Sequence, residues 1–279
     1  MNISLLILTY NEIVHLKRLL RNISMFDDII FIDSYSNDGT AKFIEKYSKI
    51  NKNIKYFKNR YYNQSRQLDW TIKNIKFKND FIFKLDADEV VSDDLLIEIK
   101  KIFSENNNIP SSINGFYVRR NIYFMQKLLK WGGVYNLPVI RIFRKDHFKI
   151  EKRSMDEHIL VKNFSKITKG CINDINLNDF EFYIKKHIDY AIKESDEIEN
   201  TSFEDSKEKM PFRVYLKKKT KYRIYYKLPP IFRSFMVFIY RYLILLGLLD
   251  GKKGFYFHFV NSFLYRAIVD LLILLKKNK

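Results

Sequence analysis

Three acidic residues follow an apolar run in the stretch Phe81-Ile82-Phe83-Lys84-Leu85-Asp86-Ala87-Asp88-Glu89. The apolar, aromatic run predicts a buried strand. In an open α/β sheet, ligands bind just outside the carboxyl ends of strands, and Asp86 and Asp88 are expected at such an end. Oxygen ligands there suit a hard cation, Mg²⁺ or Mn²⁺, that also holds a substrate's phosphates. The alternative is an ordinary acidic turn before a helix, because helix N-termini also favour acids.

Strand and helix patterns alternate through the first half of the chain. Apolar runs at 3–8, 28–33 and 54–57, like the run at 81–85, predict buried strands. After each run, apolar residues recur at the spacing of a helix. Asn11 and Ser92 are the expected N-caps of the first and the last of these helices. This β-α series predicts a mostly parallel sheet with helices on both faces. The sequence contains neither a Walker-type phosphate loop nor a Gly-x-Gly-x-x-Gly motif, which argues against a P-loop enzyme and against a dinucleotide-binding domain of that type.

The middle of the chain is more strand-like. Strands are predicted at 115–120 and 138–144, joined by a loop that contains Trp131-Gly132-Gly133. A helix is predicted at 180–194, and the polar, charged segment 194–209 has no clear periodicity and is the expected linker.

Positive charge is concentrated in the last quarter of the chain. The formal net charge is +18, and residues 206–279 hold 17 Lys and Arg against three acidic residues. Such asymmetry indicates a basic tail that meets an anionic surface, either a membrane or a nucleic acid. Cys171 is the only cysteine, which excludes an intrachain disulfide framework and a thiolate zinc site and fits a reducing compartment. The first residues do not resemble a signal peptide.

The tail contains two apolar stretches, 231–249 and 255–275. Each is about long enough to span a bilayer, but Arg and Asp residues interrupt both, and a charge at mid-span costs at least ~2.5 kcal/mol. We therefore expect helices that lie in the membrane interface, with aromatic and basic residues at the level of the headgroups. The alternative is that these helices pack on the rest of the chain or on a second copy in a homo-oligomer.

Polar residues follow the predicted strands at several places: 9–12, 33–40, 66–69 on the third helix, and 86–89. Any one of these segments could be an ordinary turn. Together they are expected to line one edge of one sheet, because the carboxyl ends of parallel strands meet there.

In these segments the chain resembles family 2 glycosyltransferases of the GT-A fold. The resemblance rests on Leu8-Thr9-Tyr10-Asn11-Glu12, on Ile32-Asp33-Ser34 with Asp38-Gly39-Thr40, on Arg66-Gln67-Leu68-Asp69-Trp70 and on Leu85-Asp86-Ala87-Asp88-Glu89. It covers residues 1–150 and is closest to the bacterial surface-polysaccharide and lipopolysaccharide-core branch. The tail from Pro229 to Arg266 is also similar to the C-terminal region of such transferases. The resemblance implies an α/β GT-A fold, Rossmann-like, with a helical, membrane-associating C-terminal extension.

The resemblance implies nucleotide contacts at five matching positions. Thr9, Tyr10 and Glu12 would border the nucleotide, and Asp33 would hydrogen-bond the base, which we expect to be uracil. Arg66 would approach the diphosphate or the ribose. The family's variation around Arg66 leaves the choice between these two contacts open.

The resemblance also implies a metal site at the acidic stretch. Asp86 would contact the ribose or the metal, and Asp88 would hold the Mg²⁺ or Mn²⁺ that bridges the diphosphate. The leaving group is a nucleoside diphosphate, and a divalent cation neutralises the charge that develops on it. The donor expected from this pattern is a nucleotide-sugar, a UDP-hexose.

An inverting transfer also needs a base that deprotonates the acceptor hydroxyl. Family members carry an acidic residue near 156–157, so Glu157 is favoured as the base and Asp156 is the alternative; an exposed acidic turn is equally compatible with the sequence. For the acceptor, Trp131 is expected to stack on a sugar, although a Gly-rich turn covered by a Trp is nearly as compatible. Arg141 and Arg144 are expected to meet an anionic donor or acceptor.

The sequence thus predicts a catalytic domain at 1–200, with a nucleotide-sugar half (1–105) and an acceptor half (106–200), and a basic amphipathic helical region at 201–279. The expected acceptor is a lipid-linked glycan or lipopolysaccharide core, and the expected location is peripheral, on the cytoplasmic face of the bacterial inner membrane. A nucleotidyltransferase is less compatible because its Gly-rich phosphate loop is missing. A basic nucleic-acid-binding protein remains the other alternative, although the apolar runs of the tail suit lipid better than nucleic acid.

Overall fold

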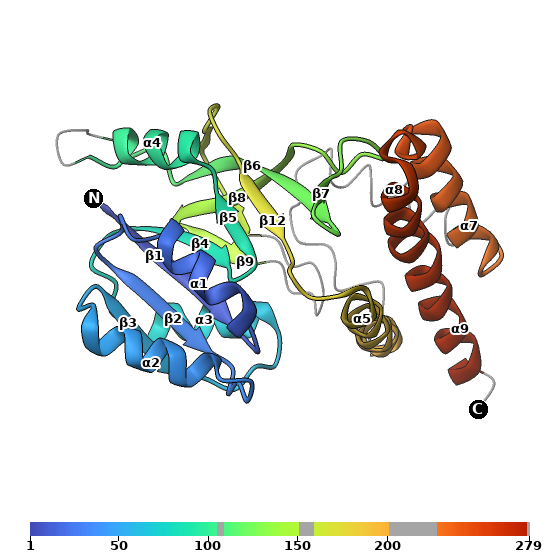
Figure 1. Ribbon diagram of the computed structural model, residues 1–279, viewed down its shortest axis with the longest axis horizontal. Coiled ribbons are helices and arrows are strands. Elements are labelled where there is room, and N and C mark those ends of the chain that lie inside the picture. Colours follow the sequence, from blue (N-terminus) through green and yellow to red (C-terminus); the bar gives the residue numbers. More distant parts are fainter. Residues whose placement is uncertain (105–108, 151–158, 201–227, 278–279) are drawn as a thin grey trace. The chain divides into compact units, whose positions relative to one another are not determined.

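The computed structural model describes residues 1–104, 109–150, 159–200 and 228–277 (Figure 1). The chain divides into two compact units. The first unit contains Met1–Leu128 and Val134–Asn178, and the second contains Leu129–Gly133 and Asp179–Lys279. The predicted residues 156 and 157 lie outside the described residues.

Four parallel strands form one half of the first unit's sheet. They are β1 (Ile3–Thr9), β2 (Ile29–Asp33), β3 (Ile54–Lys58) and β4 (Phe81–Asp86), in the spatial order β3-β2-β1-β4. Almost every residue of β1, β2 and β4 is buried. The near-continuous apolar runs that predicted these strands are therefore explained by burial of both sheet faces.

Helices cover both faces of this half-sheet. Three helices share a core on one face: α1 (Ile13–Asn22), α2 (Thr40–Ile50) and α4 (Asp93–Ile102). Leu68 of α3 (Gln64–Asn74) packs on the other face against Leu6, Ile30 and Ile82. These helices match the predicted ones, which confirms an α/β fold with helices on both faces.

Two N-cap predictions had different outcomes. Ser92 caps α4, where its side chain accepts a hydrogen bond from the Leu95 N–H. Asn11 does not cap α1: Glu12 occupies that position without a side-chain cap. Asn11 has a left-handed backbone (φ +57°), and its Oδ1 accepts from the Asn37 N–H at 2.9 Å. The prediction for Asn11 was wrong because the asparagine joins two loops instead.

The sheet continues beyond β4 with mixed strand directions, in the order β8-β6-β12-β5. These strands are β8 (Leu137–Arg144), β6 (Gly115–Phe124), β12 (Ile172–Ile175) and β5 (Glu89–Val91). Strand β8 runs antiparallel to both β4 and β6. Strands β7 (Lys127–Leu128) and β11 (Phe164–Lys166) pair with β6, while β9 (Phe148–Ile150) and β10 (Ile159–Val161) form a separate ribbon.

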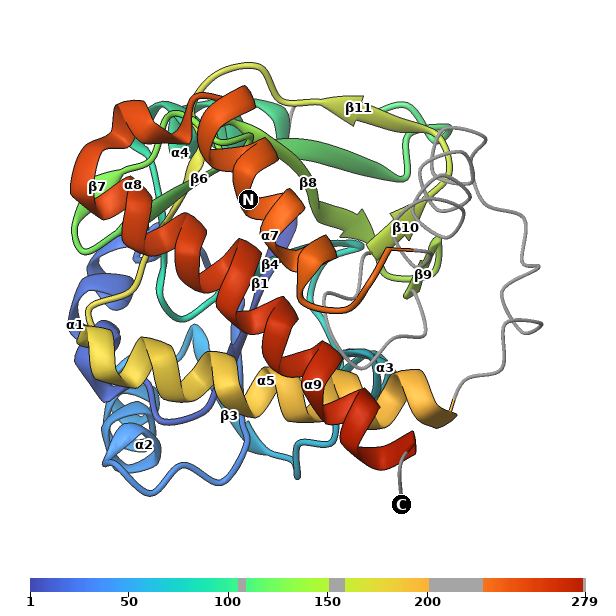
Figure 2. The same ribbon diagram turned by 90° about the vertical axis from the view of Figure 1, so that its right-hand side faces the viewer.

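The second unit is helical (Figure 2). Its elements are α5 (Phe180–Asn200), α7 (Phe232–Ile239), η3 (Tyr240–Ile244), η4 (Gly247–Asp250), α8 (Gly251–His258), η5 (Phe259–Leu264) and α9 (Tyr265–Lys277). Helix α5 is longer than predicted, so residues 194–200 are helical and not part of a linker. Ala191 and Ser195 of α5 are buried, and Asp196 forms an ion pair with Lys276 of α9, which explains the longer helix.

A buried ion pair joins α7 to α9. The Arg233 Nε donates to Asp270 Oδ2 at 2.9 Å, and the Ser234 hydroxyl donates to the same oxygen at 3.2 Å. All three residues are buried. Arg233 and Asp270 are two of the charged residues that interrupt the apolar stretches of the sequence.

The exposed surface of the second unit is rich in large apolar side chains, which include Phe232, Phe235, Met236, Leu243, Ile244, Leu249, Leu271 and Leu275. Within the described residues, one helix is long and apolar enough to cross a membrane by length and composition: Gly247–Lys276, which has 30 residues and contains an 18-residue stretch with a mean hydropathy of 1.5.

The Trp131-Gly132-Gly133 loop belongs to the second unit. Its backbone is held by Asp250, whose carboxylate accepts from the Lys130 and Trp131 N–H groups at 3.1 and 2.9 Å. A Cβ on Gly132 would lie 2.1 Å from the ring of buried His258, and Gly132 has φ +73°. Only glycine fits this close approach.

Candidate functional site

The strand register brings the predicted site residues to one edge of the sheet. Thr9 pairs with Asp33 across β1 and β2, and Leu8 pairs with Asp86 across β1 and β4. Because the three strands are parallel, their carboxyl ends coincide. Thr9, Asp33 and Asp86 therefore lie at one edge, where α/β folds bind ligands.

Asp33 is the most enclosed acid of this edge. Its side chain is fully buried, and its carboxylate accepts hydrogen bonds from the Ser36 N–H at 2.9 Å and from the Thr9 hydroxyl at 3.2 Å. The Ser36 hydroxyl donates to the same carboxylate at 2.5 Å. These donors fix the orientation of Asp33 before any ligand binds.

The loops after β1 and β2 are tied to each other. The Asn11 N–H donates to the Ser36 hydroxyl at 2.9 Å, and the Glu12 N–H donates to Thr40 at 2.8 Å. Tyr10 and Tyr35, which lie in the same two loops, are 58% and 61% exposed. An exposed aromatic ring can stack on a planar group such as a nucleotide base.

Asp86 is held by two cations. Lys84 Nζ lies 2.7 Å from its Oδ1, and Arg141 Nη2 lies 2.9 Å from its Oδ2. Burial alone would raise the pKa of Asp86, but Lys84 and Arg141 hold this pKa well below its usual range. Asp86 is therefore a permanently ionised acceptor at the edge.

Glu89 completes this charge network. It is buried, forms an ion pair with Arg141 and lies 3.4 Å from Arg120. Its Oε2 accepts from the Asp86 N–H at 2.9 Å, which shapes the turn between β4 and β5. Glu89 is therefore held by an arginine and has a structural role, which Asp88 does not share.

Asp88 is half-buried, and its contacts are few. The Asn176 side chain donates to its Oδ2 at 3.1 Å, and within the described residues Oδ1 has no hydrogen-bond partner. Burial and the charge of Asp88 both raise the pKa of Asp174. Among the residues that the structure describes, no Lys, Arg or His side chain forms an ion pair with Asp88, whereas Lys84 and Arg141 both pair with Asp86, so Asp88 is the better placed of the two to receive a further cation.

The acids fit a metal that is shared with a substrate rather than one enclosed by protein. Within the described ranges, no group of three or more His, Cys, Asp and Glu side chains could hold a metal ion. Mg²⁺ commonly binds through one or two carboxylates plus substrate phosphates and water. Asp88 can supply one carboxylate, and Asp86 keeps further lone pairs beside its two cations.

The sequence matches the family model for glycosyl transferase family 2 over residues 4–162. The chain belongs to this family. Its curled, mostly parallel sheet is the GT-A fold that the sequence predicted.

The solved structure of a mannosyltransferase shares this fold. The mannosyltransferase PcManGT from Pyrobaculum calidifontis, in complex with GDP-mannose and Mn²⁺, is 12% identical with a TM-score of 0.54; the match covers 99% of this chain and 88% of that one. The S. aureus protein TarS, residues 1–349 in complex with UDP, is 13% identical with a TM-score of 0.45, over 100% and 92% of the two chains. No curated protein matches the sequence.

Some predicted site residues of this transferase do not reach the acidic edge. Arg144 pairs with Phe81 at the amino end of β4, where its guanidinium lies 4.4 Å from the Phe81 ring centroid. Strand β8 is antiparallel to β4, so its last residue lies at the opposite end from Asp86. Arg141, three residues earlier, does reach Asp86.

Arg66 is exposed at the start of α3, with its guanidinium 5.6 Å from the Tyr62 ring centroid. The neighbouring Gln67 is buried and donates to the Ser34 hydroxyl at 3.3 Å. The transferase therefore uses Gln67 to fix the loop after β2, while Arg66 keeps its charge in solvent. Trp131 lies in the second unit and is 40% exposed.

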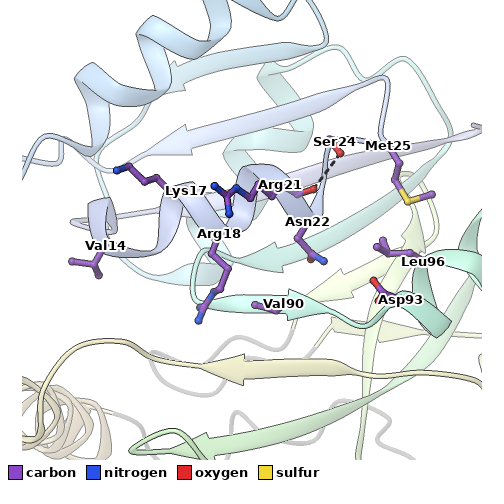
Figure 3. Close-up of a pocket in the computed structure, with 10 residues that line it drawn as sticks. All are labelled: Val14, Lys17, Arg18, Arg21, Asn22, Ser24, Met25, Val90, Asp93 and Leu96. Carbon is purple, nitrogen blue, oxygen red and sulfur yellow. Dashed lines mark hydrogen bonds between the residues drawn. The ribbon is translucent and has the colours of Figure 1, made fainter.

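A pocket of about 590 Å³ is lined by residues of α1, β5 and α4 (Figure 3). It lies near residues 86–89, which we call the acidic loop. Lys17, Arg18 and Arg21 of α1 line it together with Asp93 at the start of α4, and Met25 and Leu96 add apolar surface. In Figure 3, Arg18 points toward β5, whereas Lys17 and Arg21 extend away from that strand. The pocket is therefore basic, and one of its residues contacts the acidic loop.

Sequence reasoning missed Lys84, Arg18 and Asn176 as parts of this site, and it gave Glu89 no role of its own. Lys84 stands inside an otherwise apolar strand, and a charged residue at a buried strand position is the signal that could have drawn attention to it. Arg18 and Asn176 carry no such signal, because each reaches Asp88 from a distant part of the sequence.

Proposed function

We propose that the protein is a metal-assisted, inverting glycosyltransferase that moves a sugar from a UDP-hexose to a lipid-linked glycan. Family membership supports sugar transfer. The observation that carries the proposal is the meeting of Thr9, Asp33 and Asp86 at one sheet edge, with Asp88 two residues further on. A buried, pre-oriented carboxylate and an ionised acidic loop are what a nucleoside diphosphate with a cation requires.

In this proposal each of three acids contacts a different part of the nucleotide-sugar. Asp33 accepts a hydrogen bond from the base, between the rings of Tyr10 and Tyr35. Asp86, kept ionised by its two cations, accepts from a ribose hydroxyl. Asp88 holds Mg²⁺ or Mn²⁺, which neutralises charge on the leaving diphosphate.

The acceptor hydroxyl attacks the anomeric carbon as the bond to the diphosphate breaks. Its proton passes to a carboxylate on the other side of the sugar. Glu157 remains the proposed base, with Asp156 as the alternative. Trp131 is proposed to contact an acceptor sugar.

The second unit is proposed to hold the enzyme at the cytoplasmic surface of a bacterial inner membrane, where lipid-linked acceptors are found. The support is the set of exposed apolar side chains around a buried ion pair. Large apolar side chains exposed in such numbers are typical of membrane or protein interaction sites. The surface-polysaccharide or lipopolysaccharide-core acceptor is proposed from the sequence resemblance.

A thermal-shift panel tests the donor assignment. The protein is heated with UDP-, GDP-, CMP- and dTDP-sugars, each with and without Mn²⁺. A UDP-sugar at 100 times its Kd should stabilise the fold by about 2.7 kcal/mol, and only when Mn²⁺ is present. Stabilisation by another nucleotide class would correct the donor, and the absence of any shift would contradict the proposal.

A further inference from the structure

One stripe of α1 holds the loop that carries Asp86 and Asp88. His15, Arg18 and Asn22 lie on the same face of this helix, at a spacing of three and four residues. The Asn22 side chain donates to the Val91 carbonyl at 2.8 Å and accepts from the Val91 N–H at 2.7 Å. Because β5 is the last strand of its sheet path, Asn22 supplies the hydrogen bonds that a further strand would make.

Arg18 makes the next contact along the stripe. Its Nη2 donates to the Asp88 carbonyl at 3.0 Å and to the Ile175 carbonyl at 2.7 Å. The guanidinium therefore joins the acidic loop to the end of β12. A lysine ammonium lacks the planar fork that holds two acceptors in fixed directions.

Asn176 follows Ile175 and reaches the carboxylate of Asp88 itself. Its Nδ2 donates to Asp88 Oδ2 at 3.1 Å, and its Oδ1 accepts from the Asn178 N–H at 2.9 Å. The second bond fixes which side of the amide faces Asp88, because a backbone N–H can meet only the oxygen.

His15 anchors the same segment from α1. It is fully buried, and its Nε2 accepts from the Leu177 N–H at 2.9 Å, so Nδ1 carries the proton that faces Glu12 Oε2 at 2.5 Å. The segment 175–178 is therefore held by Arg18 and His15, and it in turn orients Asp88.

We propose that Arg18 and Asn176 are positioning residues that set the cation affinity of Asp88. This inference rests on the proposed function, because it takes Asp88 as the residue that holds the divalent cation. Arg18 fixes the backbone of Asp88, and Asn176 fixes one of its carboxylate oxygens. Groups that orient a metal ligand in this way typically change metal affinity by about 10- to 100-fold when they are lost.

The test compares two substitutions with matched controls in the full-length protein. Arg18→Met and Asn176→Leu each remove the donors to Asp88. Arg21→Met removes the same charge from the same pocket, and Asn178→Leu changes an asparagine two residues away. Neither control residue donates a side-chain hydrogen bond to Asp88 in the described part of the chain.

The readout is Mn²⁺ affinity in the presence of UDP, measured by electron paramagnetic resonance of free Mn²⁺. We expect about 10- to 100-fold weaker binding for Arg18→Met and Asn176→Leu, and wild-type affinity for both controls. Excess Mn²⁺ should restore transfer activity in the two variants, which a misfolded protein would not allow. The Mn²⁺ affinity of Arg18→Lys should lie between those of the wild type and Arg18→Met. This variant replaces Arg18→Met in the comparison if Arg18→Met does not fold.

Asp88→Asn separates this inference from the proposed function. If Asp88→Asn loses Mn²⁺ while Arg18→Met, Arg18→Lys and Asn176→Leu all keep wild-type affinity, the positioning role is overturned and the metal assignment stands. If Asp88→Asn itself binds Mn²⁺ and UDP like the wild type, the proposed metal site is wrong, and the positioning role fails with it.

Discussion

The two units of this chain place charge in different ways. In the first unit the buried charges of Lys84, Arg141 and Glu89 surround Asp86, which remains 34% exposed at the sheet edge. In the second unit an Arg233–Asp270 ion pair is buried, while Ile244 and Leu275 are 67% and 63% exposed. The first arrangement is suited to a charged ligand that arrives from water. The second is suited to apolar surroundings, because it turns its charge inward and its apolar side chains outward.

The largest expected effect concerns the charged edge. Asp88→Asn should lower transfer activity on the order of 10,000-fold, because the diphosphate loses the carboxylate that holds its cation. The melting temperature should stay within about 2 °C of the wild type, since Asp88 has few structural contacts. Initial rates with a saturating donor check the first result, and a thermal melt checks the second.

Asp80→Asn is the control for that substitution. Asp80 is exposed just before the amino end of β4, where it forms an ion pair with Lys145. Its loss should leave transfer activity unchanged. Equal losses in the two variants would mean that a general change of charge, and not the cation site, explains the effect.

A second prediction breaks the buried charge of the second unit. Arg233→Met leaves Asp270 buried without its cation and should lower the free energy of unfolding by about 3–5 kcal/mol. The double variant Arg233→Met/Asp270→Leu should recover most of this loss, because no unpaired charge remains. Urea unfolding of the full-length protein measures both. A double variant no more stable than the single one would show that the charge is not the cause.

Two glycines give a smaller contrast in stability. Gly132→Ala should cost about 2–3 kcal/mol, because its Cβ would lie 2.1 Å from the His258 ring and its φ is +73°. At Gly39 the nearest atom to an added Cβ is 3.9 Å away, so Gly39→Ala should cost only the backbone strain, about 1–2 kcal/mol. Thermal melts of both variants check the difference, and a larger loss at Gly39 would contradict the packing at Gly132.

The smallest predicted effect tests the apolar surface. Ile244→Lys should weaken binding to zwitterionic vesicles roughly tenfold, about 1.4 kcal/mol, because less apolar area is buried. Ile97→Lys is the matched control, since Ile97 lies on α4 of the first unit and is also 67% exposed. Vesicle sedimentation measures both affinities. Equal weakening, or none for Ile244→Lys, would argue against the second unit as the membrane contact.

The sequence was sufficient for the parallel half of the sheet. Apolar runs bounded by polar turns are a strong local signal, and the family motifs coincide with the strand ends that carry Asp33 and Asp86. The sequence was insufficient where distant segments decide the position of a residue. The pattern around Arg144 could not show that β8 is antiparallel to β4, which sends this arginine to the far end of the strand. Residues 194–200 looked like a linker because their helix is supported by contacts with α9.

The candidate site was predicted as a set of residues at strand ends, without the contacts that join them. What distinguishes Asp86 from Asp88 is their partners, Lys84 and Arg141 in one case and Asn176 in the other. Arg141 and Asn176 are brought to the loop by strands β8 and β12, so no local sequence pattern could pair them with these acids.

A crystal structure with UDP and Mn²⁺ would show where the donor and the metal ion bind. We predict the uracil ring beside Asp33, between Tyr10 and Tyr35, and the metal ion bound by Asp88 and the diphosphate. A nucleotide bound elsewhere, such as in the basic pocket lined by Lys17 and Arg21, or a diphosphate without a metal ion at Asp88, would contradict this prediction.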